Sequence, residues 1–311
     1  MIVTKTPLRI SFVGGGSDRP WFSSEEPGAC VAAAIDKYVY VAVNPKYDGS
    51  IRAAYSLTEN VGSVSELQHE LMRHALGWFP FDGGIELHSI ADIPGGMGLG
   101  SSSSFTVGAV AALAAHVGQE TTPSVRAKLA GIIELDECKK PIGLQDQYTA
   151  AYGGLNLLTF TIAGVSVDPI ESDLDALSAH CLLLDTGLAR NGDAGHVLAS
   201  QRQDRDDVRE LAWLAQCFAQ LLRDGELEAC GGIMRDAWQI KRQFVAEVYG
   251  RMVAVAEQAG AWGGKLCGAG GGGFLLLMAP PERHQAVAQA LGLRHVPIRV
   301  GVEGCRVVFA S

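Results

Sequence analysis

The sequence predicts an α+β fold divided into two domains. Two glycine-rich segments, residues 94–105 and 263–273, separate two sets of apolar runs. Runs typical of β-strands precede the first segment and helical patterns follow it, whereas an apolar strand directly follows the second. A chain of 311 residues is long enough for two ordinary domains. We place the boundary in the loop-rich stretch near residue 165 and expect domains at residues 1–165 and 166–311.

The composition argues against several classes of protein. The 25 basic and 34 acidic residues leave a net charge of −9, and there is no basic cluster, so we expect no nucleic-acid partner. No apolar run reaches the roughly 18 residues of a membrane span, and residues 1–7 lack the apolar core of a signal peptide. Seven dispersed cysteines without CxxC spacing indicate reduced thiols. We therefore expect a cytoplasmic monomer or homo-oligomer without a membrane partner.

The first domain begins with β-rich runs. Residues 8–13 alternate between apolar and polar side chains and predict a strand, and residues 30–43 contain two further β-rich runs. Residues 64–76 carry leucines at helical spacing and predict an amphipathic helix. His69 and His74 in this helix are five residues apart, whereas the two-histidine zinc motif requires a spacing of four. These histidines are therefore interpreted as part of a solvated helix face.

A strand expected at residues 84–89 leads into the first glycine-rich segment. Each glycine in a helix costs about 1 kcal/mol relative to alanine, so the four glycines here predict a tight loop. The apolar run at residues 105–115 predicts a buried helix directly after it. Such a helix N-terminus offers unpaired N–H groups to an anion, and the serine hydroxyls before it can bind phosphate or Mg²⁺. A flexible Gly/Ser linker is the alternative, but linkers do not run straight into an apolar helix.

The pattern Pro-x-x-x-Gly-Leu-Gly-Ser-Ser-Ser at residues 94–103 resembles the phosphate-binding motif of the GHMP kinase superfamily. Its longer form, residues 92–108, is closest to the branch of D-glycero-D-manno-heptose 7-phosphate kinases. The resemblance implies a ribosomal S5 domain 2-like N-terminal domain and a ferredoxin-like C-terminal domain. It also implies that ATP binds at Pro94, Gly95, Gly96, Gly98, Leu99, Gly100, Ser101, Ser102 and Ser103.

Residues 7–18 are similar to the first motif of this superfamily. Three glycines end the first strand, and Ser17 and Asp18 predict the cap of a short helix. Taken alone, Arg9 and Asp18 are equally consistent with a surface ion pair. The resemblance implies instead a sugar site that contains Arg9, Gly15, Gly16, Ser17 and Asp18. Arg19 stands where the family usually has an apolar residue, and it adds a cation to this site.

A helix is predicted at residues 123–135, with a cluster of carboxylates that includes Glu134 at its end. Carboxylates are unfavourable at a helix C-terminus, so we expect a compensating lysine or metal ion. The chain then breaks at Pro141 and continues into a short helix closed by two glycines. In the mevalonate-kinase pattern, which this segment resembles, a metal-binding glutamate precedes the proline by seven residues. The resemblance therefore implies that Glu134 and Ser102 bind Mg²⁺.

Asp146 lies on this short helix, in the pattern Gly143-x-x-Asp146-Gln147-Tyr148. A lone aspartate is more often a helix cap than a catalytic group. The pattern, however, resembles the segment around the catalytic aspartate of galactokinase-type and heptose kinases. The resemblance thus implies that Asp146 and Arg9 are catalytic and that Asp146 and Tyr152 contact the substrate.

The second domain starts with a predicted strand at residues 181–185. Arg190 follows in a segment that resembles a segment of the GHMP kinases. We expect Arg190 either to contact a substrate phosphate or to cap a helix. Helical patterns continue through most of the next seventy residues, at residues 192–202, 206–223, 227–244 and 246–259.

The second glycine-rich segment formally matches GxGxxG at residues 268–273. A dinucleotide fingerprint must follow a strand and open a helix, whereas here an apolar strand, residues 274–278, follows the glycines. We therefore exclude nicotinamide binding. The segment resembles the third GHMP motif, and this implies that Gly270 and Gly271 belong to the substrate site.

The resemblance predicts a phosphotransferase that acts on an alcohol group. The γ-phosphoryl group of MgATP would pass to the anomeric hydroxyl of D-glycero-D-manno-heptose 7-phosphate and give the 1,7-bisphosphate. An acceptor phosphate needs a cation in the cleft, and Arg19, Lys37 and Arg190 are the expected candidates. The alternatives are another sugar or sugar phosphate (octose 8-phosphate, fucose-like or galactose-like) and an inactive relative that binds sugar or ATP as a regulator.

Overall fold

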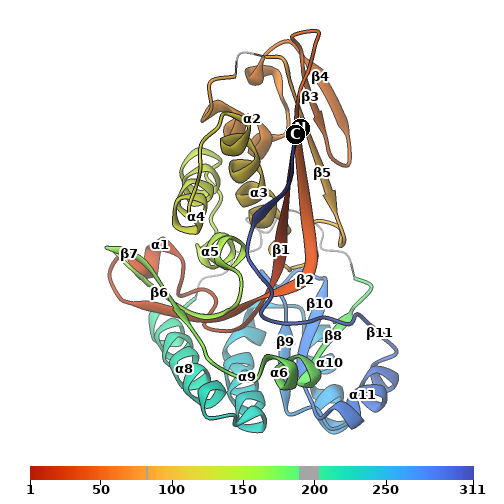
Figure 1. Ribbon diagram of the computed structural model, residues 1–311. Coiled ribbons are helices and arrows are strands. Elements are labelled where there is room, and N and C mark those ends of the chain that lie inside the picture. Colours follow the sequence, from red (N-terminus) through yellow and green to blue (C-terminus); the bar gives the residue numbers. More distant parts are fainter. Residues whose placement is uncertain (82, 189–202) are drawn as a thin grey trace.

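The computed structural model describes residues 1–81, 83–188 and 203–311 (Figure 1). Within them, a mixed eight-stranded sheet follows the order β12-β1-β2-β5-β3-β4, and β6 and β7 extend it from β2. Neighbouring strands are antiparallel except for β3 and β5. The strands are β1 (Ile2–Val13), β2 (Gly28–Pro45), β3 (Ile51–Ala54), β4 (Thr58–Val61), β5 (Ile85–Ala91), β6 (Leu155–Thr161), β7 (Gly164–Pro169) and β12 (Arg306–Ala310).

The long ribbon of β1 and β2 runs through both halves of the molecule (Figure 1). From Thr6 onward every residue of β1 is buried. Helix α3 (Ser101–His116) covers the beginning of β1, where the Thr4 hydroxyl donates to the Gly108 carbonyl at 3.0 Å. Helix α8 (Arg205–Arg223) covers its end, where the rings of Phe12 and Phe218 stack 5.2 Å apart. The first strand is therefore held by elements from both parts of the sequence.

Helix α3 lies at the centre of the upper part of the molecule in Figure 1. Its residues 103–114 are all buried, as expected for a helix that is small or apolar on every side. Two predicted helices differ from the observed ones, because residues 64–76 divide into a short 3₁₀ turn and α2, and the helix from residue 123 changes into a π-helical turn. The elements here are α1 (Pro20–Ser23), the 3₁₀ turn Val64–Glu66, α2 (Glu70–Gly77), α4 (Pro123–Gly131), the π-helical turn Ile132–Glu137 and α5 (Gln145–Tyr152).

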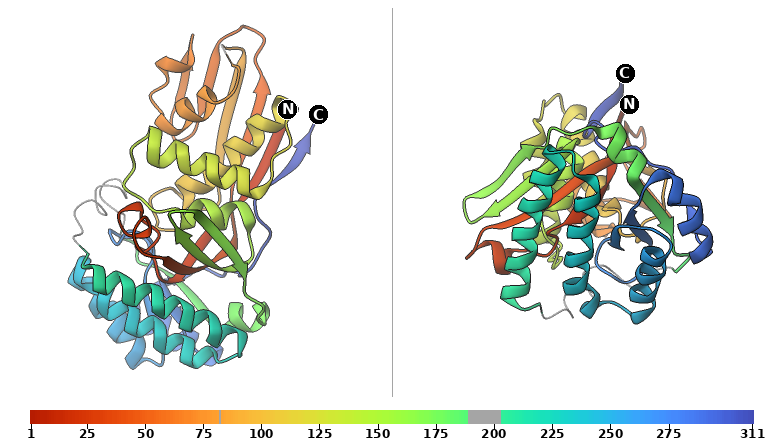
Figure 2. Two further views of the ribbon diagram at one scale, coloured as in Figure 1. Left: turned by 90° about the vertical axis from the view of Figure 1, so that its left-hand side faces the viewer. Right: turned by 90° about the horizontal axis from the view of Figure 1, so that it is seen from below.

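A second sheet, with order β11-β8-β10-β9, is antiparallel throughout. Its buried strands pack against long helices at the lower end of the molecule (Figure 2). The predicted helix at residues 192–202 lies outside the described residues. The elements are α6 (Leu174–His180), β8 (Cys181–Asp185), α9 (Leu227–Lys241), the 3₁₀ turn Arg242–Phe244, α10 (Glu247–Gln258), β9 (Gly263–Leu266), β10 (Phe274–Met278), the 3₁₀ turn Pro281–Arg283, α11 (His284–Leu291) and β11 (Arg294–His295).

The two ends of the chain meet at the edge of the first sheet. The amino group of Met1 donates to the Ser311 carbonyl at 3.0 Å, because β12 returns to pair with β1. The segment after residue 165 therefore contributes β12 and most of β7 to the first sheet, as well as the whole of the second. The α+β class is confirmed, and the division at residue 165 remains a prediction.

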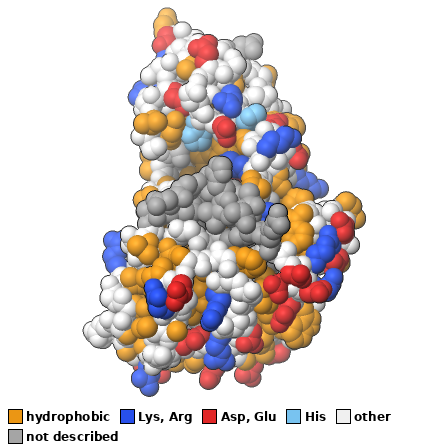
Figure 3. Space-filling view, turned by 180° about the vertical axis from the view of Figure 1, so that it is seen from behind, with side chains coloured by type: hydrophobic (Ala, Val, Ile, Leu, Met, Phe, Trp, Pro, Cys, Tyr) orange, Lys and Arg blue, Asp and Glu red, His pale blue; other side chains and the backbone are white. Residues whose placement is uncertain are grey.

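The surface carries mixed charge. On the face shown in Figure 3, the basic side chains of the described residues are interspersed with acidic ones rather than gathered into one patch. Among the helices that the structure describes, none combines the length and the apolar character needed to cross a bilayer.

The two glycine-rich segments lie against each other with almost no space between their backbones. A Cβ atom placed on Gly98 would come within 2.6 Å of the Cys267 carbonyl oxygen, and one on Gly273 within 2.1 Å of the Met97 carbonyl oxygen. Both glycines have positive φ angles, 82° and 103°. Glycine is required at both positions, because any side chain would force the two loops apart.

We expect Gly273→Ala to destabilise the protein more than Gly164→Ala, a matched control. Both residues have positive φ, but nothing lies within 4 Å of a Cβ on Gly164. Both variants should lose roughly 1–3 kcal/mol from backbone strain, and Gly273→Ala should lose about 1–3 kcal/mol more from overpacking. Urea unfolding measures both free energies, and equal losses would show that the two loops separate without cost.

Candidate active site

A cleft opens between the two sheets and collects the ends of many elements. It contains about 1210 Å³ of space, including the part open to solvent, which is enough for two small ligands side by side. Its walls come from the β1–α1 turn, the first glycine-rich loop, the start of α5, the end of α9 and the second glycine-rich loop. The polar and charged residues that line it are Arg9, Ser11, Asp18, Arg19, Ser101, Ser102, Ser103, Lys140, Gln145, Asp146, Gln203, Lys241 and Lys265.

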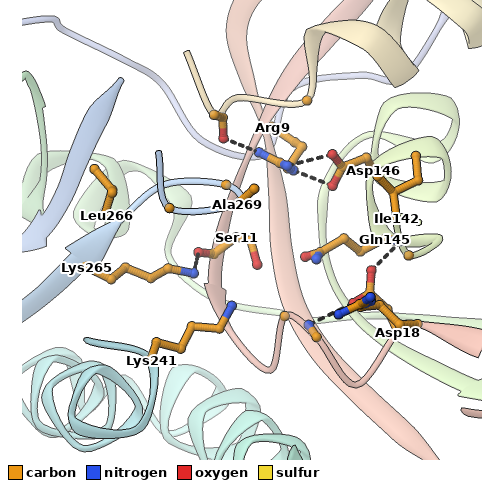
Figure 4. Close-up of a pocket in the computed structure, with 18 of the residues that line it drawn as sticks. Arg9, Ser11, Asp18, Ile142, Gln145, Asp146, Lys241, Lys265, Leu266 and Ala269 are labelled. Carbon is orange, nitrogen blue, oxygen red and sulfur yellow. Dashed lines mark hydrogen bonds and ion pairs between the residues drawn. The ribbon is translucent and has the colours of Figure 1, made fainter. Parts of the chain in front are cut away.

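Arg9 of β1 and Asp146 of α5 form a bidentate ion pair in this cleft (Figure 4). Arg9 Nε and Nη2 donate to the two carboxylate oxygens at 2.7 and 2.6 Å, and Nη1 donates to the Gly98 carbonyl at 2.7 Å. Burial lowers the pKa of Arg9, but the charge and hydrogen bonds of Asp146 outweigh burial and leave this pKa raised. The guanidinium is therefore a permanent cation that holds the carboxylate beside the first glycine-rich loop.

The first glycine-rich loop delivers the N-terminus of α3 to the cleft. Gly100 is the N-cap residue with φ of 74°, no side chain caps the helix, and its first turn contains no acidic residue. Ser101, Ser102 and Ser103 line the cleft. The loop thus presents backbone N–H groups and hydroxyls where an anion can bind.

Not every predicted residue of this loop faces the cleft. Gly96, Gly98 and Gly100 do so, whereas Pro94, Gly95 and Leu99 do not. Leu99 is buried, and its carbonyl accepts the backbone N–H of Arg9 at 3.0 Å.

Glu134 is fully buried at the π-helical turn that follows α4. Its carboxylate accepts hydrogen bonds from Ser102 Oγ at 2.9 Å, from Ser103 Oγ at 2.7 Å and from the Gln147 amide. Burial raises the pKa of Glu134, although these donors and Lys140 oppose the shift. Widened turns of this kind are frequent at functional sites, and this one directs the carboxylate toward the start of α3.

Ser102 and Glu134 fit a magnesium ion. Mg²⁺ prefers oxygen ligands at about 2.0–2.1 Å in an octahedron, so adjacent ligands lie about 2.9 Å apart, as these two oxygens do. Lys140 Nζ lies 3.4 Å from the same hydroxyl. Two oxygens from the protein are enough for Mg²⁺, which commonly takes its remaining ligands from phosphates and water.

The turn after β1 forms the opposite wall of the cleft. The Asp18 carboxylate accepts the backbone N–H of Gly16 at 2.9 Å and that of Gln145 at 3.2 Å. A Cβ atom on Gly143 would lie 2.0 Å from an Asp18 oxygen, so the predicted Gly143 and Asp18 segments touch directly. Gly15, Gly16 and Asp18 all line the cleft, as does Arg19.

Several predicted substrate residues lie elsewhere. Ser17 is buried, and its hydroxyl bonds the backbone of Gly14 and Ala29. Tyr152 is 38% exposed and stacks on Tyr148 away from the cleft. Lys37 pairs with Asp36 at 3.1 Å outside the cleft.

The second glycine-rich segment is only partly in contact with the cleft. Gly270 lines it and Gly271 does not. Arg190 lies outside the described residues. The roles predicted for all of these residues remain predictions.

Two lysines that sequence reasoning missed complete the wall. Lys241 ends α9, and Lys265 lies within the buried strand β9, where its Nζ donates to the Ser11 carbonyl at 2.8 Å. Burial, together with the nearby charge of Lys241, lowers the pKa of Lys265 to about 7. A lysine inside the glycine-rich and apolar run 263–267 was the one available signal in the sequence.

We expect the stability of the wild type to rise with pH relative to that of Lys265→Met. Below pH 7 the lysine is charged in both folded and unfolded states, and burial of that charge destabilises the fold. Between pH 7 and the ordinary value of 10.5 the folded protein has lost a proton that the unfolded chain retains. The wild type should therefore gain up to about 1.4 kcal/mol per pH unit relative to the variant. Urea unfolding at pH 6, 7.5 and 9 measures this difference, and a constant difference would contradict it.

The comparisons with known proteins agree with this architecture. The chain matches the model of the GHMP kinases N-terminal domain at residues 63–154 and that of the GHMP kinases C-terminal domain at residues 215–297. It is 27% identical to D-glycero-alpha-D-manno-heptose 7-phosphate kinase of Campylobacter jejuni over 93% of each chain. It is 24% identical to galactokinase of Mycobacterium bovis over 92% of this chain and 91% of the relative.

A solved structure shares the whole fold. A D-glycero-D-manno-heptose 1-phosphate kinase from Bacteroides thetaiotaomicron superposes with a TM-score of 0.83 at 24% identity, covering 100% of both chains. Together with the two family models, this likeness confirms the predicted two-domain fold. The chain belongs to the GHMP kinase family of phosphotransferases.

Proposed function

We propose that this GHMP kinase transfers the γ-phosphoryl group of ATP to the anomeric hydroxyl of D-glycero-D-manno-heptose 7-phosphate, giving the 1,7-bisphosphate. The observation that carries the proposal is the Arg9–Asp146 pair, which lies beside the uncapped N-terminus of α3 in one cleft. An anion site next to a fixed carboxylate is what phosphoryl transfer to a hydroxyl requires. The similarity to the heptose 7-phosphate kinase of Campylobacter jejuni supports the choice of acceptor.

The nucleotide phosphates would bind at the first turn of α3. The N–H groups and hydroxyls at residues 101–103 would hold the β- and γ-phosphates, with Lys140 beside them. Lys139 has φ of 52°, an unfavourable angle for a lysine, and this turn brings Lys140 to Ser102. When bound between Ser102 and Glu134, Mg²⁺ would neutralise charge on the phosphate oxygens.

Asp146 would accept the proton of the acceptor hydroxyl. As the sugar oxygen bonds to the γ-phosphorus, the bond from that phosphorus to the β–γ bridging oxygen breaks and ADP leaves. The transition state of phosphoryl transfer is loose and leaves little covalent chemistry for the protein to do. Positioning of the hydroxyl is then the main contribution of Asp146, and Arg9 would stabilise the negative charge that develops nearby. Asp18 would bind sugar hydroxyls.

A sugar panel tests this proposal. ADP formation should be fastest with heptose 7-phosphate when compared with free heptose, octose 8-phosphate, fucose and galactose. A galactose-type preference would favour the second candidate, a kinase for another sugar, which the similarity to galactokinase supports. Binding of ATP and sugar without any turnover would indicate an inactive regulator.

We expect Asp146→Asn to lower kcat by at least about a hundredfold, because it removes the proton acceptor. ATP affinity should stay near that of the wild type, since the phosphates bind elsewhere. Steady-state kinetics and nucleotide titration measure the two quantities. Retention of more than a tenth of the wild-type kcat would remove Asp146 from this role.

Ser102→Ala and Glu134→Gln should each raise the Mg²⁺ concentration required for half-maximal activity. Each removes one of the two hard oxygen ligands that the protein offers, whereas sugar affinity should change less. Activity titrated against free Mg²⁺ measures the midpoint, with Ser65→Ala as a control at an exposed serine outside the cleft. An unchanged midpoint in both variants would exclude them as ligands.

A further inference from the structure

A second polar cluster lies in the cleft at Gly15. A Cβ atom on Gly15 would lie 3.1 Å from Gln145 Nε2, 3.3 Å from Lys241 Nζ and 3.6 Å from Ser11 Oγ. These three side chains come from α5, α9 and β1, and all of them carry hydrogens that can be donated. Lys265 is connected to these side chains, because its Nζ donates a hydrogen bond to the Ser11 carbonyl. We call Ser11, Gln145, Lys241 and Lys265 the lysine cluster.

The donors of the lysine cluster exceed its acceptors. Among the described residues, Lys241 has no hydrogen bond or ion pair, and the buried Ser11 hydroxyl has no partner. The adjacent carboxylate, Asp18, already accepts two backbone N–H groups. Two ammonium groups held together in a protein interior are unfavourable unless an anion joins them. Burial lowers the pKa of Lys241 and of Lys265, which shows how poorly this environment solvates their charge.

The lysine cluster is separate from the groups that would hold the nucleotide. The N-terminus of α3 has its own lysine, because Lys140 Nζ lies 3.4 Å from Ser102 Oγ. Figure 4 shows Lys241 and Lys265 on the far side of Ser11 from the Arg9–Asp146 pair. An acceptor whose reacting hydroxyl lies at Asp146 would therefore extend its other end toward the two lysines.

We propose that the lysine cluster binds the phosphate that the acceptor carries at the end remote from its reacting hydroxyl. The inference rests on the proposed function, and it assigns the preference for phosphorylated sugars to Lys241 and Lys265, which the sequence-based candidates Arg19, Lys37 and Arg190 did not include. Lys241 would pair directly with the phosphate, while Ser11 and Gln145 would donate hydrogen bonds to it. Gly15 leaves open the space that the phosphate oxygens occupy.

The test compares kcat/KM for D-glycero-D-manno-heptose 7-phosphate with that for the free heptose. The wild type should favour the phosphate by at least about a hundredfold. Lys241→Met should reduce this ratio at least about tenfold, because the lost ion pair belongs to the phosphate alone. Lys241→Arg should retain most of the ratio, since it keeps the charge.

Two further variants complete the test: the first is a matched control, and the second fills the space between the donors. Arg242→Met removes an exposed cation one residue away and outside the cleft, and it should leave the ratio unchanged. Gly15→Ala inserts a methyl group among the donors at a residue whose φ is not positive. It should lower the ratio mainly through KM of the phosphorylated sugar.

Direct binding separates this inference from the proposed function. Calorimetric titration of heptose 7-phosphate in the presence of ADP should show weaker binding to Lys241→Met than to Arg242→Met. Absence of turnover with every sugar would overturn the proposed function, and the titration would still decide the inference. Three results would overturn the inference and leave any kinase activity intact. They are equal binding of heptose 7-phosphate to both variants, no binding to the wild type, and an undiminished ratio of kcat/KM values in Lys241→Met.

Discussion

The ion pair between Arg9 and Asp146 is the constraint on which the site depends. It joins residues 137 positions apart in the sequence, and the same guanidinium also binds the Gly98 carbonyl. The backbone N–H of Arg9 bonds the next residue of that loop, Leu99. One buried side chain thus fixes the distances between the first strand, the glycine-rich loop and α5. Displacement of any of them would leave a buried charge unpaired, at a cost of about 3–5 kcal/mol.

Such pairs contribute little to net stability, because desolvation offsets their attraction. The same holds for Glu134, a fully buried carboxylate that three side-chain donors keep hydrogen-bonded. Apolar residues in place of both Arg9 and Asp146, or of Glu134 together with its donors, would satisfy the fold at least as well. Their presence is better explained by positioning, because both carboxylates are held rigidly near the N-terminus of α3, where a phosphate would bind.

The sequence predicted the parts of the site that lie within short motifs. The glycine loop, Arg9, Asp18 and Asp146 all reach the cleft, because each is placed by a turn or helix end a few residues long. Lys241 and Lys265 could not be found in this way, since only the folding of α9 and β9 toward β1 brings Lys241 to Gly15 and Lys265 to Ser11. The π-helical turn was missed because the spacing of its apolar residues continues that of α4. The pairing of β12 with β1 was missed because no local sequence pattern indicates which strand β12 joins.

The lysines also explain how an acidic protein can bind two anionic ligands. The chain has a net charge of −9, yet five cationic side chains and only two carboxylates line the cleft among the described residues. Salt screens exposed charges beyond about 8–10 Å, so the acidic exterior has little effect inside, while the walls exclude water and strengthen nearby interactions. Arg9 is occupied by Asp146 and Lys140 lies at the phosphate loop. Arg19, Lys241 and Lys265 remain, and among the described residues of the cleft Asp18 is the carboxylate whose charge acts on Arg19 and Lys241. A single neutral sugar beside ATP would therefore leave part of this positive charge uncompensated.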